Sequence, residues 1–297
     1  MTTRFSIPTT WNTSDHCNKL FELWEQISQL PLKNNLHIEF DFHKCKFLSH
    51  NGVAFLGGLA HFIEDNGGKV VFMWDTLDPK IRMNLAQNGF LNCFGESQES
   101  WDGNSIPYRR DSQQDKSVIM DYLLDKWLGR GWLRISPQLR DVIAGQVSEI
   151  YGNAFEHSQS EIGIFSCGQH YPKKGCLELS VIDFGVGIPT KVRSLPKNSC
   201  YSSEEALEWA LQFGNSTVPD MCRGLGLNLL QEFVKCNHGI LKIFSNDIYV
   251  KITDNDDAKY KKQKVDFSGT LINITLKCSE TYYCLDSGVS ENSSIRF

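Results

Sequence analysis

The order of apolar and polar residues predicts two α/β regions separated by a polar stretch. In the first region, residues 36–42 alternate as a half-buried strand does, and residues 51–66 place their apolar side chains on one helical face. Residues 69–73 predict a second strand, and a short helix begins after Asp78. The order strand, helix, strand, helix therefore predicts a small α/β domain over residues 1–94.

The middle and the end of the chain carry weaker patterns. Residues 95–103 are polar without a hydrophobic period, which predicts a linker, and residues 118–132 predict an amphipathic helix. Residues 95–135 are therefore interpreted as a linker plus this helix. The apolar face of the helix could pack on either domain or on a second copy of the chain, so a homodimer stays open. The Ser- and Asn-rich residues 279–297 predict a flexible tail.

A long helix is predicted after Ser136, and it carries a polar stripe beside its apolar face. Glu149, Asn153 and His157 recur every four residues and therefore point the same way. Asparagine is unfavourable inside a helix because its amide competes for backbone hydrogen bonds. The stripe indicates either a functional site or an ordinary solvated helix face.

Two glycine-containing turns follow this helix. Residues 177–182 alternate as a strand and lead into Asp-Phe-Gly-Val-Gly at 183–187, where an acid stands beside glycines that let a ligand approach the backbone. Residues 223–230, Arg-Gly-Leu-Gly-Leu-Asn-Leu-Leu, open a helix whose first N–H groups would attract phosphate. Residues 190–222 hold one short helix and predict a mobile lid. A Gly-Thr pair at 269–270 then begins another strand.

The order of these motifs resembles the GHKL superfamily, and more narrowly its histidine-kinase-like ATPase domain. The resemblance covers residues 136–278 and consists of Glu-x3-Asn-x3-His on a helix, Asp-x-Gly-x-Gly after a strand, a lid, a Gly-x-Gly-Leu helix and Gly-Thr on a strand. It implies an α+β fold of the Bergerat type, in which helices pack on one face of a mixed sheet. It also implies that the domain binds ATP together with Mg²⁺.

The resemblance assigns a role to each matching residue. Glu149 would be the catalytic acid that orients or deprotonates the attacking group, and Asn153 would supply an amide oxygen to Mg²⁺. Asp183 would accept a hydrogen bond from the exocyclic amine of adenine, and His157 would contact the lid or support the structure. The other residues that the resemblance places in ATP binding are Gly185, Gly187, Gly224, Leu225, Gly226, Leu227 and Thr270.

The first domain resembles a STAS domain, the fold of anti-sigma-factor antagonists, through its element order and the segment Phe-Leu-Ser-His-Asn-Gly-Val at 47–53. The loop of that family is Asp-Ser-Ser-Gly, in which the serine before the glycine accepts phosphate. Here Asn51 stands at the acceptor position, and Ser49 stands where the family has its acid. The domain is therefore interpreted as a degenerate STAS-like domain used for docking, with phosphorylation not expected.

Together the two resemblances imply an ATP–Mg²⁺-binding regulatory protein of the anti-sigma-factor type. It would be a nucleotide-gated switch with slow ATPase or protein serine/threonine kinase activity toward a STAS-like or other regulatory partner. The alternatives are a non-catalytic module that binds proteins in an ATP-dependent way, and a soluble histidine kinase. His50 and His61 are the candidate phosphate acceptors for the last class.

Composition narrows the partners and the compartment. With Lys+Arg 30 and Asp+Glu 35, the net charge is −5, so we expect neither nucleic acid nor a membrane surface as a partner. Phosphates would have to be attracted by local groups. The 10 cysteines have no Cys-x-x-Cys spacing and are interpreted as buried, reduced thiols, which favours the cytoplasm. The chain has no apolar run of membrane-spanning length and no signal-peptide pattern at its start.

Overall fold

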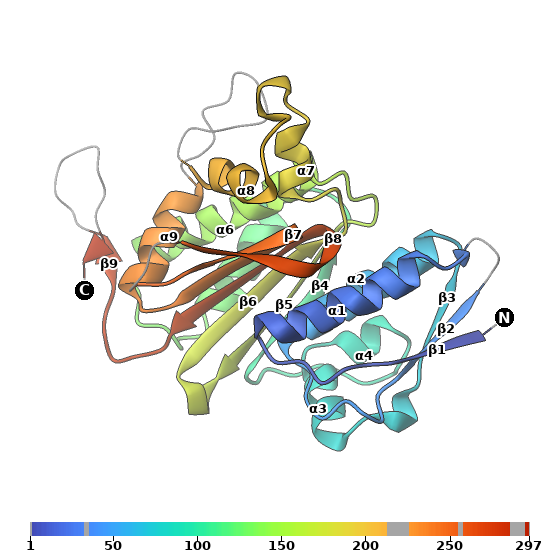
Figure 1. Cartoon of the computed structure of the whole chain (residues 1–297). Helices are drawn as coiled ribbons and strands as arrows, with labels where there is room; N and C mark the ends of the chain where they lie inside the picture. Colours follow the sequence, from blue (N-terminus) through green and yellow to red (C-terminus); the bar gives the residue numbers. More distant parts are fainter. Residues whose placement is uncertain (1, 33–35, 213–225, 255–257, 286–294, 297) are drawn as a thin grey trace.

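The computed structural model describes residues 2–32, 36–212, 226–254, 258–285 and 295–296. They form an α+β fold with a three-stranded parallel sheet and a five-stranded antiparallel sheet, besides a short two-stranded pairing near the C-terminus. Figure 1 shows the five-stranded sheet in the middle of the molecule and the three-stranded sheet beside the N-terminus. The α+β class predicted from the sequence is confirmed at this level.

The N-terminal unit is a repeated strand–helix arrangement whose strands pair in the order β1-β2-β3, all parallel. The predicted strands and helices are present, while β1 and α1 were not predicted. Asp78 caps α3 as expected, since its Oδ1 accepts a hydrogen bond from the Lys80 backbone N–H at 2.9 Å. The elements are β1 (Thr2–Ser6), α1 (Ser14–Ser28), β2 (His37–Asp41), α2 (His50–Asp65), β3 (Lys69–Phe72), η2 (Trp74–Thr76), α3 (Pro79–Gln87) and α4 (Phe90–Cys93).

The five-stranded sheet has the order β4-β5-β6-β8-β7, and every pairing in it is antiparallel. The expectation of a mixed sheet is therefore wrong. The expectation of a linker over 95–135 is also wrong in part, because β4 lies within that range as an edge strand. The strands of the five-stranded sheet are β4 (Ser105–Asp111), β5 (Ile164–Tyr171), β6 (Cys176–Asp183), β7 (Ile240–Ile252) and β8 (Lys259–Lys277).

One face of this sheet carries the helices of the second half, with α6 and α9 lying along it (Figure 1). The helix predicted at 118–132 is instead α5 followed by a π-helical turn, and its buried Trp127 packs within the same chain. The start of α6 after Ser136 is confirmed, and Ser202 caps α8 in a capping box with Glu205. The helices are α5 (Lys116–Asp121), η3 (Tyr122–Leu128), α6 (Pro137–His157), η4 (Pro172–Lys174), α7 (Ile188–Arg193), η5 (Pro196–Asn198), α8 (Ser203–Leu211) and α9 (Gly226–Cys236).

The other face of the sheet is covered by α1 and α2, which lie between the two sheets (Figure 1). The ring of Phe21 in α1 stacks on Phe267 of β8 with centroids 4.7 Å apart, and Phe55 of α2 lies 5.8 Å from the same ring. Helices therefore cover both faces of the sheet, which corrects the expectation of helices on one face only. The N-terminal unit and the sheet share one continuous apolar core.

The loop at the start of α2 faces the sheet and not the solvent. Ser49, His50 and Asn51 are all buried, and His50 Nδ1 lies 3.3 Å from Glu178 Oε2 on β6. Burial lowers the pKa of His50 to about 4, so this ring is neutral at physiological pH. Ser49, His50 and Asn51 are thus buried inside the chain, and His50 contacts the sheet.

The expected flexible tail is ordered in part. Tyr283 is buried against Phe233, and its backbone N–H donates to Arg134 O at 2.9 Å. Beyond it, β9 (Cys284–Leu285) pairs with β10 (Ile295–Arg296). One buried aromatic ring thus fixes a segment whose composition is otherwise typical of a frayed end.

Two further expectations concern the cysteines and the membrane. Every cysteine that the structure describes is free, while Cys222 lies outside the described residues. Cys93 and Cys200 are exposed, so not all of the thiols are buried. Within the described ranges, no helix is both long enough and apolar enough to cross a bilayer.

Candidate functional site

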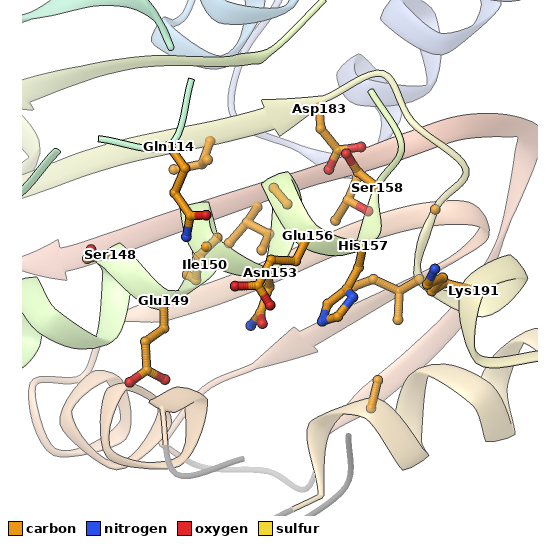
Figure 2. A pocket seen from close by; sticks show the side chains of 18 of the residues that line it. Gln114, Ser148, Glu149, Ile150, Asn153, Glu156, His157, Ser158, Asp183 and Lys191 are labelled. Carbon is orange, nitrogen blue, oxygen red and sulfur yellow. The ribbon is translucent and has the colours of Figure 1, made fainter. Parts of the chain in front are cut away.

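A cavity of about 420 Å³ opens between α6, the end of β6, the middle of β8, and the helices α7 and α8. Figure 2 shows polar side chains from several elements converging on it. The residues that line it include the following: Gln114, Lys116, Ile119, Ser148, Glu149, Ile150, Gly152, Asn153, Ala154, Glu156, His157, Ser158, Val181, Asp183, Gly187, Ile188, Lys191, Val192, Trp209, Ala210, Leu211, Thr270 and Ile272.

The polar stripe of α6 forms one wall of this cavity. Glu149, Asn153 and His157 all line it, which confirms that their spacing places them on one face. Glu149 and Asn153 are exposed, so both side chains are accessible to a ligand. In Figure 2, Glu149, Asn153 and His157 follow one another along α6, and Asp183 lies well away from Glu149. The cavity therefore has two chemically different ends.

The Asp183 end is enclosed. Asp183 is the last residue of β6, pairs with Thr270 of β8 and is only 4 % exposed. Burial raises the pKa of Asp183 to about 7, while hydrogen bonds from the backbone of Gly185 and Thr270 act in the opposite direction. Gly185 N–H donates to Asp183 Oδ1 at 2.9 Å. The carboxyl group is thus held in place with capacity for one further donor, and such a donor would stabilise its charged form.

The two glycines after Asp183 are required by contacts within the protein. A Cβ on Gly185 would lie 1.9 Å from the Ser158 carbonyl oxygen at the end of α6. Gly187 has a φ of +82°, and a Cβ there would lie 2.4 Å from Asn246 Oδ1. Gly187 lines the cavity, whereas Gly185 packs against α6. Both glycines were predicted from the sequence as part of the site, but the predicted reason was the approach of a ligand to the backbone. The structure shows contacts within the protein instead.

Two residues of β7 hold this turn, and sequence reasoning missed both. Ile188 N–H donates to Ser245 Oγ at 2.8 Å, and that hydroxyl lies 3.0 Å from Thr270 Oγ1. Asn246 Oδ1 accepts from Thr190 N–H at 3.2 Å, and Asn246 itself has a φ of +51°. The one signal in the sequence was the polar pair Asn246-Asp247, which interrupts the apolar stretch 240–252 and is typical of a bulge or a bend.

Lysine side chains add positive charge to the cavity. Lys191 on α7 and Lys116 at the start of α5 both line it. Trp209 of α8 contributes an aromatic surface. No sequence motif marks these residues, because each becomes part of the site only through its place in the fold.

The glycine turn before α9 is described only in part. Gly224 and Leu225 lie outside the described residues, as do residues 213–222 of the predicted lid. Gly226 and Leu227 open α9, which confirms that this turn leads into a helix. The described part of the segment predicted as a lid consists of α7, η5 and α8, and both α7 and α8 contribute to the cavity wall.

The donor set at the open end suits a hard cation that is shared with phosphates. No group of three or more His, Cys, Asp or Glu side chains suited to a metal occurs in the described part of the chain. Mg²⁺ in phosphate-binding sites uses one or two protein oxygens and takes its other ligands from phosphate and water. The exposed Asn153 amide, one turn from the Glu149 carboxylate, fits that pattern. The chain matches no protein-family model and no curated protein in sequence, so the chemistry of this cavity is the ground for assigning a function.

Proposed function

We propose that this cavity binds ATP with Mg²⁺, with adenine at the enclosed end. The observation that carries the proposal is the buried carboxyl group of Asp183, which is held by Gly185 N–H and lines the cavity. The exocyclic amine of adenine is a donor that would complete its hydrogen bonds. Guanine has a carbonyl oxygen at the equivalent position, and it would meet the carboxylate with like partial charges.

The other end of the cavity is suited to phosphates. Figure 2 shows Asp183 well away from Glu149, so the base and the terminal phosphate would occupy different ends of the cavity. Asn153 would supply an oxygen ligand to Mg²⁺ between them. Lys191 and Lys116 offer positive charge to the phosphate chain although the protein as a whole is acidic.

The wider proposal is a GHKL-type ATPase domain of the Bergerat fold, joined to a degenerate STAS-like domain. It is supported by the helix with Glu149 and Asn153, the strand-end acid Asp183 and the helix opened by Gly226, which packs on α6. We infer a cytoplasmic regulatory role, in which ATP controls binding to a protein partner and is turned over slowly or transferred to a Ser or Thr of that partner.

The alternative of a histidine kinase is disfavoured by the positions of its two candidate phosphate acceptors, His50 and His61. His50 is 3 % exposed and lies between α2 and the large sheet, against Glu178, so a phosphate donor could not reach it without separating these two layers. His61 stacks on Phe165 with ring centroids 5.7 Å apart, and its Nδ1 lies 3.1 Å from Arg110 Nη1.

The proposal is tested by titrating the purified protein with ATP and with GTP in a calorimeter, each with and without Mg²⁺. We expect ATP to bind in the micromolar range, and GTP to bind at least about tenfold more weakly because a buried carboxylate discriminates between the two base edges. Equal affinity for both nucleotides would contradict adenine recognition by Asp183. Absence of binding to either would contradict the proposal as a whole.

Replacing Asn153 with Ala is expected to remove the Mg²⁺-dependent part of ATP binding. In the presence of Mg²⁺ we expect affinity to fall roughly tenfold or more, as it does when coordination of a bound metal is disturbed. With EDTA, wild type and variant should bind ATP equally, since the lost interaction runs through the cation. A matched control is Glu156→Ala, which removes another exposed α6 side chain at the cavity. An equal loss in EDTA would contradict the role given to Asn153.

A further inference from the structure

Phe184 lies between two residues of the candidate site but points away from the cavity. Asp183 is the last residue of β6 and Phe184 follows it directly, and the two side chains lie on opposite sides of the sheet. Asp183 lines the cavity, whereas the Phe184 ring packs into the core shared with the N-terminal unit. Its centroid lies 5.4 Å from that of Phe55 and 6.3 Å from that of Phe62, both on α2.

The ring of Phe184 fits closely against α2 at a glycine. A Cβ added to Gly58 would lie 2.2 Å from a Phe184 ring carbon and 2.9 Å from one of Phe165. On the sheet side, Phe267 meets the Phe184 ring edge-on, with centroids 5.5 Å apart. Since packed cores transmit displacement instead of absorbing it, a shift of α2 at Gly58 must move this ring.

The backbone around Phe184 is tied directly to the adenine end of the cavity. Gly185 N–H donates to Asp183 Oδ1 at 2.9 Å, and Val186 N–H donates to Ser158 O at 2.7 Å. Gly185 has no spare room beside α6. Aromatic rings surround Phe184 on α2 and on the sheet, so there is little space for its ring to rotate away from α2. A displacement of the ring is therefore expected to move the Phe184 backbone, which changes the position of the Asp183 carboxyl group or breaks one of these hydrogen bonds.

We propose that Phe184 is a positioning residue through which α2 of the N-terminal unit controls the affinity and base selectivity of the cavity. This inference rests on the proposed ATP site, and it assigns the N-terminal unit the role of regulating that site. Coupling between two sites is reciprocal, so a ligand at Asp183 also changes the stability of the α2 contact. A partner that binds the N-terminal unit would alter nucleotide binding by the same route.

The experiment compares two neighbouring glycines of α2. Gly58→Ala places a methyl group against Phe184, while the control Gly57→Ala places one 2.2 Å from Tyr108 Oη, away from Phe184. Both changes give the same gain in helix propensity. We expect Gly58→Ala to weaken ATP binding about fivefold or more and to shrink the preference for ATP over GTP. We expect Gly57→Ala to stay within about twofold of wild type.

A second substitution tests whether the ring itself carries the effect. In Gly58→Ala/Phe184→Leu the smaller side chain makes room for the added methyl group, so ATP affinity and selectivity should return toward those of Phe184→Leu alone. A merely structural role of Gly58 would give no such rescue. If Gly58→Ala does not fold, Phe184→Leu alone is compared with Phe62→Leu, and only the former is expected to lose selectivity. Equal effects in either pair would overturn the proposal.

Hydrogen exchange of the free protein separates this inference from the ATP proposal. Amide exchange at 185–188 is expected to be faster in Gly58→Ala than in Gly57→Ala, since Gly185, Val186 and Ile188 lose well-formed hydrogen bonds. If the wild type binds no ATP but this difference is present, the proposed ligand is wrong and the coupling stands. If the exchange rates are the same, the coupling is wrong whatever the cavity binds.

Discussion

Asp183→Asn is expected to stabilise the free protein above neutral pH and at the same time to weaken ATP binding. Burial raises the pKa of Asp183 to about 7, so keeping it charged costs folding free energy at higher pH. Asparagine keeps an oxygen for the Gly185 N–H and carries no charge. Its amide cannot replace a carboxylate facing the adenine amine, so affinity should fall by about 10- to 100-fold.

The sign of the pH dependence follows from the raised pKa. Below the ordinary pKa of an aspartate, Asp183 is protonated in both folded and unfolded chains and contributes no difference. As the pH rises from about 4 to about 7, the unfolded chain loses this proton first, so the free energy of unfolding of the wild type decreases. The free energy of unfolding of Asp183→Asn does not decrease in this way, and above pH 7 it should exceed that of the wild type by roughly 2–4 kcal/mol.

Urea unfolding of wild type and Asp183→Asn at pH 4 and pH 8 measures this directly. The two proteins should be similar at pH 4 and differ at pH 8. In a parallel titration, ATP should bind the wild type more weakly at pH 6 than at pH 8, because the carboxyl group must first lose its proton. That pH dependence should disappear in the variant. A variant that is less stable at pH 8, or that binds ATP as tightly as wild type, is inconsistent with this role of Asp183.

Glu149→Gln is expected to leave ATP binding intact and to remove turnover. The side chain is exposed at the open end of the cavity, one turn from Asn153, where a carboxylate can accept the proton of an attacking water or hydroxyl group. Glutamine preserves the shape but cannot accept that proton. Loss of a positioned general base lowers a rate by about 10²- to 10⁴-fold.

The measurement is phosphate release, and phosphate transfer to added partner proteins, from γ-labelled ATP. Label on a partner Ser or Thr in the wild type alone establishes a kinase, while labelled phosphate in solution establishes an ATPase. If wild type has no turnover and both proteins respond to ATP only by a change in partner binding, the non-catalytic binding module is the correct class. A variant with wild-type turnover would exclude Glu149 as the base.

The site could be predicted where its geometry is local in the sequence. Glu149, Asn153 and His157 share a face because residues four apart in an α-helix lie about one turn apart. Asp183 is the last residue of a strand whose apolar and polar residues alternate clearly in the sequence. Ser245 and Asn246 act on a turn that is distant in sequence, so no local pattern reveals them. The contact of Phe184 with α2 likewise depends on how the N-terminal unit lies on the sheet.

The same distinction explains the errors in the fold. The strand β4 lies within the range predicted as linker and helix, and its Arg109 forms an ion pair with Asp111 on the same strand. The strand β1 is short and mostly polar, and it is ordered by parallel pairing with β2. The packing of α1 and α2 on the second face of the large sheet is a tertiary contact. Helical periodicity predicts which face of a helix is buried, but not which element it packs against.

The central claim is that the cavity beside α6 binds ATP through Asp183 and Asn153. The most direct measurement is a crystal structure of the protein with a non-hydrolysable ATP analogue and Mg²⁺. We expect the adenine amine within hydrogen-bond distance of the Asp183 carboxylate, and the cation bound by the Asn153 amide oxygen and the phosphates. A nucleotide bound elsewhere, or one whose base faces away from Asp183, would contradict the account.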